Sequence, residues 1–196
     1  MELVELLQSP SNDRTPLVQG AEKFDRICEH ILSLLGEAVL LHRSGSHARA
    51  AFIAITALEE TGKAVLGLHI AHPSSSTARG GALRSHPTKQ LLGAGPLPLQ
   101  LRSRLVQMLG STDAERVLSM AWSGGLVQVR EGAAYFDVEE GELSVPEDAV
   151  SADLARCILV FALDSFDDAI VGYTNESYRI GRAAEALLAE IAEIAR

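Results

Sequence analysis

The sequence predicts an all-α protein: a helical bundle with a long N-terminal helical hairpin and a short irregular or hairpin insert near residues 123–146. Over most of the chain, apolar residues recur at the three- and four-residue spacing of amphipathic helices. Within the insert, clustered glycines and spaced valines replace that pattern. At 196 residues the chain is long enough for one sizeable core. We therefore expect a single helical domain over residues 1–196, with residues 1–14 as a candidate disordered tail.

The first helix of the hairpin is predicted over residues 16–43. Thr15 and Pro16 form a start signal, because Thr caps free backbone N–H groups and Pro is tolerated at the first helical position. The apolar positions that follow share one face: Leu17, Ala21, Phe24, Ile27, Cys28, Ile31, Leu34, Leu35, Ala38 and Leu41. Ser44-Gly45-Ser46 then breaks the helix.

The second helix of the hairpin begins near His47 and has almost no polar face, since residues 48–58 are nearly all Ala, Ile, Leu or Phe. A helix that is apolar on every side must be surrounded, so this segment is predicted to be the central helix of the bundle. It is expected to end near His72-Pro73, where a loop rich in Ser and Gly follows.

The remaining elements follow from the same patterns. Shorter helices are predicted within residues 83–95, 99–109 and 113–122, a short hairpin near residues 139–141, and longer helices over residues 149–171 and 176–196. Trp122, the sole tryptophan, is expected in the core.

Composition excludes several classes of protein. With 47% hydrophobic and 22% charged residues, the chain is not disordered, collagen-like or a disulfide scaffold. Cys28 and Cys157 lie far apart in apolar segments and are expected to be buried and reduced. The acidic N-terminus does not resemble a signal peptide and no apolar run is long enough to span a bilayer, so a cytoplasmic location without membrane contact is expected.

The most informative local feature is Glu59-Glu60-Thr61-Gly62-Lys63, which follows directly after the apolar helix. Adjacent side chains on a helix point about 100 degrees apart, so the two carboxylates cannot share one site equally. Glu60 and Lys63 can line one cleft while Glu59 binds a neighbouring helix. The alternative is an ion pair that only lets a buried helix reach the surface.

Charge is unevenly distributed along the chain. The formal net charge is −9, yet the segment 61–112 contains no Asp or Glu and carries +6, which leaves −15 for the rest. Its basic residues are Lys63, Arg79, Arg84, Lys89, Arg102 and Arg104, with His69, His72 and His86 beside them. Such a segment favours local binding of an anion such as phosphate or an RNA backbone. The alternative is a flexible loop that lacks acids by chance.

A third feature pairs Arg130 with Tyr135, a cationic fork and a phenol that can both contact phosphate. A metal site at His69 and His72 is not expected, because no Cys or HExxH partner accompanies them. Gly124-Gly125 lacks the context of a nucleotide-binding loop, and the serine-rich loops lack the motif of an activated nucleophile. No metal or cofactor is therefore expected.

The order of these motifs resembles the AbiV family of abortive-infection proteins, a branch of the HEPN superfamily. The matching elements are Ala51-x6-Leu58-Glu59-Glu60-x-Gly62-Lys63, His86-x2-Lys89 and Arg130-x4-Tyr135-Phe136-Asp137. The resemblance implies a HEPN-like bundle, a role in phage defence directed at RNA and a homodimer. Many HEPN proteins are metal-independent ribonucleases in which a His follows an Arg after four to six residues. Here Tyr135 stands where that His is expected after Arg130.

The resemblance and the chemistry of RNA cleavage suggest a role for each residue. His86 serves as acid or base, Glu60 as a base beside Lys63, and Arg130 as the cation that stabilises the phosphorane. Tyr135 positions phosphate, and the expected substrate-binding residues are Glu59, Lys63, Arg84 and Lys89. Two other classes stay open: a non-catalytic module that binds RNA, a nucleotide or a phage protein, and a helical adaptor whose polar motif is a buried network.

Overall fold

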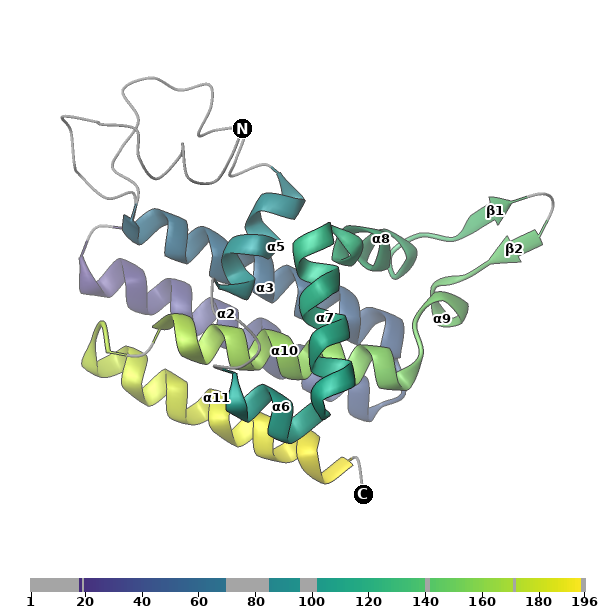
Figure 1. The fold of residues 1–196 in the computed structure, drawn as a ribbon. Helices are drawn as coiled ribbons and strands as arrows, with labels where there is room; N and C mark the ends of the chain where they lie inside the picture. Colours follow the sequence, from purple (N-terminus) through teal and green to yellow (C-terminus); the bar gives the residue numbers. More distant parts are fainter. Residues whose placement is uncertain are drawn as a thin grey trace.

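The computed structural model describes residue 18 and residues 20–69, 85–95, 102–139, 142–170 and 172–194. The protein is an all-α bundle, as the sequence predicts (Figure 1). Its centre is formed by four long helices: α2 (Ala21–Arg43), α3 (His47–His69), α10 (Ala152–Ile170) and α11 (Asn175–Ile194). Helix α3 packs against α2 and α10, and α11 packs against α2 and α10, so the four helices close into one core.

The predicted N-terminal hairpin is confirmed, with its turn at Ser44–Ser46. Helix α2 begins at Ala21, later than expected. Gly20, the residue before it, has a φ of 82° and is therefore not helical. The proposed start signal at Thr15 and Pro16 lies outside the described residues. Helix α3 is buried on several sides, from Ala48 to Leu58, and contacts α2, α5, α8 and α10, which confirms that it is the central helix.

Short helices cover one side of this core (Figure 1). They are α5 (His86–Ala94), α6 (Ser103–Leu109), α7 (Ser111–Ser123), α8 (Gly125–Gly132) and α9 (Pro146–Ala149). Strands β1 (Asp137–Glu139) and β2 (Glu142–Ser144) form an antiparallel hairpin that projects from the bundle as an arm, which confirms the hairpin predicted near residues 139–141. Among the described residues, no helix has the length and apolar character needed to cross a membrane.

Helices α3 and α5 approach each other closely because glycines face each other's backbone. A Cβ at Gly62 would overlap the carbonyl oxygen of Lys89, and one at Gly93 would overlap that of Leu58. A close approach of this kind leaves room only for glycine at both positions. The Gly of the Glu-Glu-x-Gly-Lys motif therefore sets the distance between the two helices that carry the candidate site.

Two arginines at the start of α6 anchor this helix to acidic side chains of α10. Arg104 Nε lies 2.7 Å from Asp164 Oδ1, Arg104 Nη1 lies 2.5 Å from Asp167 Oδ2, and Arg102 contacts Asp164 at 3.3 Å. Burial lowers the pKa of Arg104, but hydrogen bonds and charge from Asp167 and Asp164 outweigh it and the net shift is upward. Arg102 and Arg104 belong to the segment 61–112, which contains no Asp or Glu. Both are therefore neutralised by acids of α10.

Two sequence predictions are wrong. The stretch after Ser123 was expected to be irregular, but residues 125–132 form α8, because Gly124 adopts the left-handed conformation (φ 81°) and links two helices instead of ending helical structure. Trp122 was expected in the core but is 50% exposed, since it lies on the outer face of α7. Cys28 and Cys157 are buried free thiols, as expected. Burial, with a smaller contribution from Asp25, raises the pKa of Cys28 to about 12.

Candidate functional site

The candidate site is centred on the buried carboxylate of Glu59, which α3 presents to α5. Glu59 is 3% exposed. Its Oε2 lies 2.7 Å from His86 Nδ1 and 3.0 Å from Lys89 Nζ, and its Oε1 accepts a hydrogen bond of 2.9 Å from Gln90 Nε2. One carboxylate thus binds three side chains of a neighbouring helix, and we call these residues, with Arg130, the Glu59 cluster.

The local sequence of α5 explains why its side chains converge on Glu59. Ser85 caps the helix, since its hydroxyl accepts a hydrogen bond from the N–H of Thr88 at 3.4 Å. His86, Lys89 and Gln90 then fall at positions i, i+3 and i+4, which lie on one face of a helix. The two facing glycines bring that face within hydrogen-bond distance of α3.

Arg130 joins the Glu59 cluster from α8. Its Nε lies 3.8 Å from Glu59 Oε1, an ion-pair distance but too long for a hydrogen bond. Its guanidinium carbon lies 5.0 Å from the centre of the Phe52 ring, which is a cation–π contact. The Nε atom is buried and has no hydrogen-bond partner among the described residues.

The environment keeps Glu59 ionised. Burial raises the pKa of this carboxyl, but the hydrogen bonds from His86, Gln90 and Lys89, together with the charge of Lys89, outweigh burial, and the net shift is downward. An ionised carboxylate has no proton to donate, so the short contact requires the proton on His86 Nδ1. In neutral His86 the lone pair is then on Nε2, the ring nitrogen that does not face Glu59.

The ionisable side chains of the Glu59 cluster differ in how far they are exposed to solvent. The side chains of Glu59 and Lys89 are 4% and 7% exposed, whereas those of His86 and Arg130 are 39% and 24% exposed. A ligand arriving from solvent therefore meets an imidazole and a guanidinium first. With Lys89 balancing Glu59, the formal charge of the cluster is positive, which suits an anion and not a metal ion.

The other residues predicted for the site lie elsewhere or in pairs of their own. Glu60 forms an ion pair with Lys63 one turn further along α3. Tyr135 lies beyond the end of α8 at the root of the arm, where it is 72% exposed. Arg84, Arg79 and His72 lie outside the described residues. The structure thus brings together Glu59, His86, Lys89 and Arg130.

Sequence reasoning missed Gln90 and Phe52. Gln90 is fully buried and orients Glu59, and its only sequence signal is its position four residues after His86. Phe52 reads as one more apolar residue of α3, so its contact with Arg130 has no signal in the sequence. Among the described residues, no group of three or more His, Cys, Asp or Glu could hold a metal ion.

Comparison with known proteins gives one match. The family model of AbiV, a HEPN family, matches residues 21–165, which contain α2, α3 and all four charged residues of the Glu59 cluster. No curated protein and no solved structure matches the chain. The family match covers most of the sequence and agrees with the all-α bundle described above. The chain therefore belongs to the AbiV family of abortive-infection proteins, which act in phage defence.

Proposed function

We propose that this protein acts on RNA during phage defence and cleaves it without a metal ion, with His86 as the group that transfers a proton. The observation that supports this most is the 2.7 Å contact between Glu59 Oε2 and His86 Nδ1. It fixes the tautomer and orientation of an imidazole whose side chain is 39% exposed, so that Nε2, the nitrogen that does not face Glu59, can serve as a general base.

The proposed reaction is an internal transfer at phosphorus. His86 Nε2 takes the proton of the ribose 2′-hydroxyl, and the 2′-oxygen attacks the adjacent phosphorus. The bond from phosphorus to the 5′-oxygen breaks, the 5′-oxygen takes a proton from solvent, and a 2′,3′-cyclic phosphate remains. Arg130 stabilises the negative charge that develops on the phosphorane oxygens.

In this proposal Lys89 and Glu59 support the reaction without contacting the reacting atoms. Glu59 is a positioning residue for His86, and Lys89 balances its charge at 3.0 Å, so the buried carboxylate does not repel an approaching phosphate. Glu60, which the sequence suggested as a base, is paired with Lys63, and the proposal assigns it no proton transfer.

The test uses purified protein, single-stranded RNA and excess EDTA. Wild type is expected to release fragments ending in cyclic phosphate, while His86→Asn loses this activity. His30→Asn, which changes an exposed histidine of α2, is the matched control and keeps it. Cleavage by His86→Asn at the rate of wild type would overturn the proposal.

A second candidate function is a non-catalytic module that binds RNA, a nucleotide or a phage protein. It is favoured by Tyr135, which stands where other HEPN proteins place a His and is 72% exposed. The same assay separates the two, because this candidate predicts RNA binding that Arg130→Ala weakens, with intact RNA recovered from wild type.

We also propose that the protein works as a homodimer that uses the β1–β2 arm. Phe136, Val138 and Leu143 on the arm are 69%, 55% and 64% exposed, and a lone two-stranded hairpin is at best marginally stable in water. Light scattering is expected to give twice the chain mass, and Phe136→Ser with Leu143→Ser is expected to give the monomer.

A further inference from the structure

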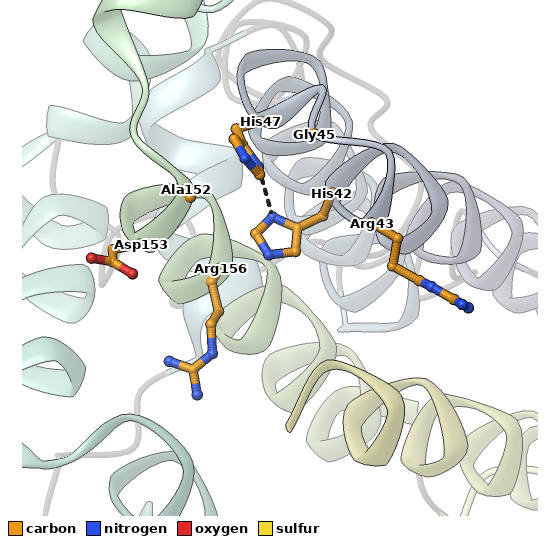
Figure 2. A pocket seen from close by; sticks show the side chains of 7 residues that line it. All are labelled: His42, Arg43, Gly45, His47, Ala152, Asp153 and Arg156. Carbon is orange, nitrogen blue, oxygen red and sulfur yellow. Dashed lines mark hydrogen bonds between the residues drawn. The ribbon is translucent and has the colours of Figure 1, made fainter. Parts of the chain in front are cut away.

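A pocket of about 510 Å³ lies where α2, α3 and α10 meet (Figure 2), and none of its lining residues belongs to the Glu59 cluster. His42 and Arg43 end α2, His47 opens α3, and Asp153 and Arg156 lie in the first turns of α10. This volume is typical of sites for small molecules. Twelve residues of α3 separate His47 from Glu59, or about 18 Å along the helix axis.

Arg156 is half-buried and brings a positive charge to the pocket. Its Nη2 donates to the carbonyl oxygen of Met108 at 3.1 Å, and its Nε is buried without a hydrogen-bond partner among the described residues. Among the described residues no carboxylate forms an ion pair with Arg156, and an anion in the pocket would supply this partner. Arg43, by contrast, forms an exposed ion pair with Glu190 of α11.

The two histidines contact each other through the same ring atom. His42 Nδ1 and His47 Nδ1 lie 3.3 Å apart, so one of them donates and the other accepts (Figure 2). Burial, followed by the charges of His47 and Arg156, lowers the pKa of His42. The lowered pKa favours the neutral form of His42, and its second ring nitrogen points away from His47 (Figure 2).

We propose that this pocket binds the phosphate group of a small molecule, with Arg156 as the main contact and His42 as the second. The anion would pair with the guanidinium of Arg156 and would stabilise the protonated form of His42, in which Nδ1 donates to His47 and Nε2 donates to the anion. The site shares no residue with the Glu59 cluster, so the inference stands apart from the proposed function.

Because His42 is expected to take up a proton when the anion binds, the proposal also predicts how the affinity depends on pH. The groups that face His42 are Arg43 on its own helix, His47 on α3, and Arg156 and Asp153 on α10, with Glu190 of α11 behind Arg43. Sulfate is the useful probe, because it stays a dianion across the range in which imidazoles titrate. Its affinity for the pocket is therefore expected to rise on acidification from about pH 8 to about pH 6.

The experiment is isothermal titration of the full chain with sulfate, with AMP and with adenosine. Sulfate and AMP are expected to bind with one site per chain and adenosine far more weakly. Arg156→Lys is expected to weaken sulfate about tenfold, since an ammonium lacks the planar set of donors with which a guanidinium binds an anion. Arg26→Lys, at an exposed arginine of α2, is the matched control and should bind like wild type.

A second variant keeps the proposal testable if Arg156→Lys is unstable. His42→Asn is expected to abolish the rise in sulfate affinity on acidification while weak binding to Arg156 remains. Three results would overturn the proposal: no binding of sulfate, binding that neither variant changes, or tight binding of Zn²⁺ that His42→Asn abolishes, which would identify the histidine pair as a metal site.

Discussion

Glu59 Oε2 lies 2.7 Å from His86 Nδ1, although 27 residues separate the two in sequence. The contact depends on the close approach of α3 and α5, and it joins a fully buried carboxylate to an imidazole at the surface. Lys89, Gln90 and Arg130 surround the same carboxylate. The geometry therefore distinguishes two adjacent acids: Glu59 orients the imidazole, and Glu60 pairs with Lys63.

Glu59→Gln is expected to reduce RNA cleavage about a hundredfold, because the amide no longer fixes the proton on His86 Nδ1. Glu60→Gln is expected to have a much smaller effect, since Glu60 contacts Lys63 and not His86. The measurement is the initial rate of cleavage at saturating RNA, with folding checked by circular dichroism. Equal losses in the two variants would contradict the assignment of Glu59.

Arg130→Lys is expected to lower both RNA affinity and the cleavage rate, by about tenfold or more. A lysine keeps the charge but loses the planar fork, whose central carbon lies 5.0 Å from the centre of the Phe52 ring. The rates should be compared with those of Arg26→Lys, an exposed arginine of α2. If Arg130→Lys behaves like this control, a general positive charge is sufficient and the fork has no role.

Gly62→Ala is expected to destabilise the fold by about 3 kcal/mol, because the new methyl group overlaps the Lys89 carbonyl and forces α3 and α5 apart. Gly36→Ala is the matched control: Gly36 lies within α2 and a Cβ there meets nothing within 4 Å. The free energy of unfolding of Gly36→Ala is expected to rise by about 0.5–1 kcal/mol, because Ala has the higher helix propensity. Urea denaturation measures both, and a neutral Gly62→Ala would refute the close approach.

Elements of the fold that have local sequence signals can be predicted from the sequence, and elements that depend on tertiary contacts cannot. The α2–α3 hairpin is predictable, since a long helical period, a Ser-Gly-Ser break and an apolar helix are all local signals. Helix α8 is not, because Gly124 and Gly125 are equally compatible with a loop and with a left-handed link between helices. The exposure of Trp122 depends on which face of α7 the bundle covers.

The candidate site was partly predictable in the same sense. Helical geometry implies that Glu59 and Glu60 face different ways, and the spacing of His86 and Lys89 places both on one face. Which of the two acids meets α5 depends on the rotation of α3 in the bundle, which no local pattern encodes. Arg130 was singled out as a candidate anion-binding residue, but its approach to Glu59 from α8 is a tertiary contact that the sequence does not predict.

Acid is expected to remove the stabilisation that Glu59 provides. Because the folded pKa of this carboxyl lies below its ordinary value of 4.5, its contribution is complete above that pH and is lost as the pH falls through the folded pKa. The gap in unfolding free energy between wild type and Glu59→Gln should therefore narrow below about pH 4.5. A gap that stays constant with pH would contradict the lowered pKa.

Chemical rescue of His86→Ala tests the central claim, that His86 transfers the proton, most directly. The variant is expected to cleave RNA at least about a hundredfold more slowly than wild type, and added imidazole should restore much of the rate. The rescue should depend on Glu59 and fall in the double variant Glu59→Gln, His86→Ala. Cleavage by His86→Ala at the rate of wild type, with no response to imidazole, would contradict the account.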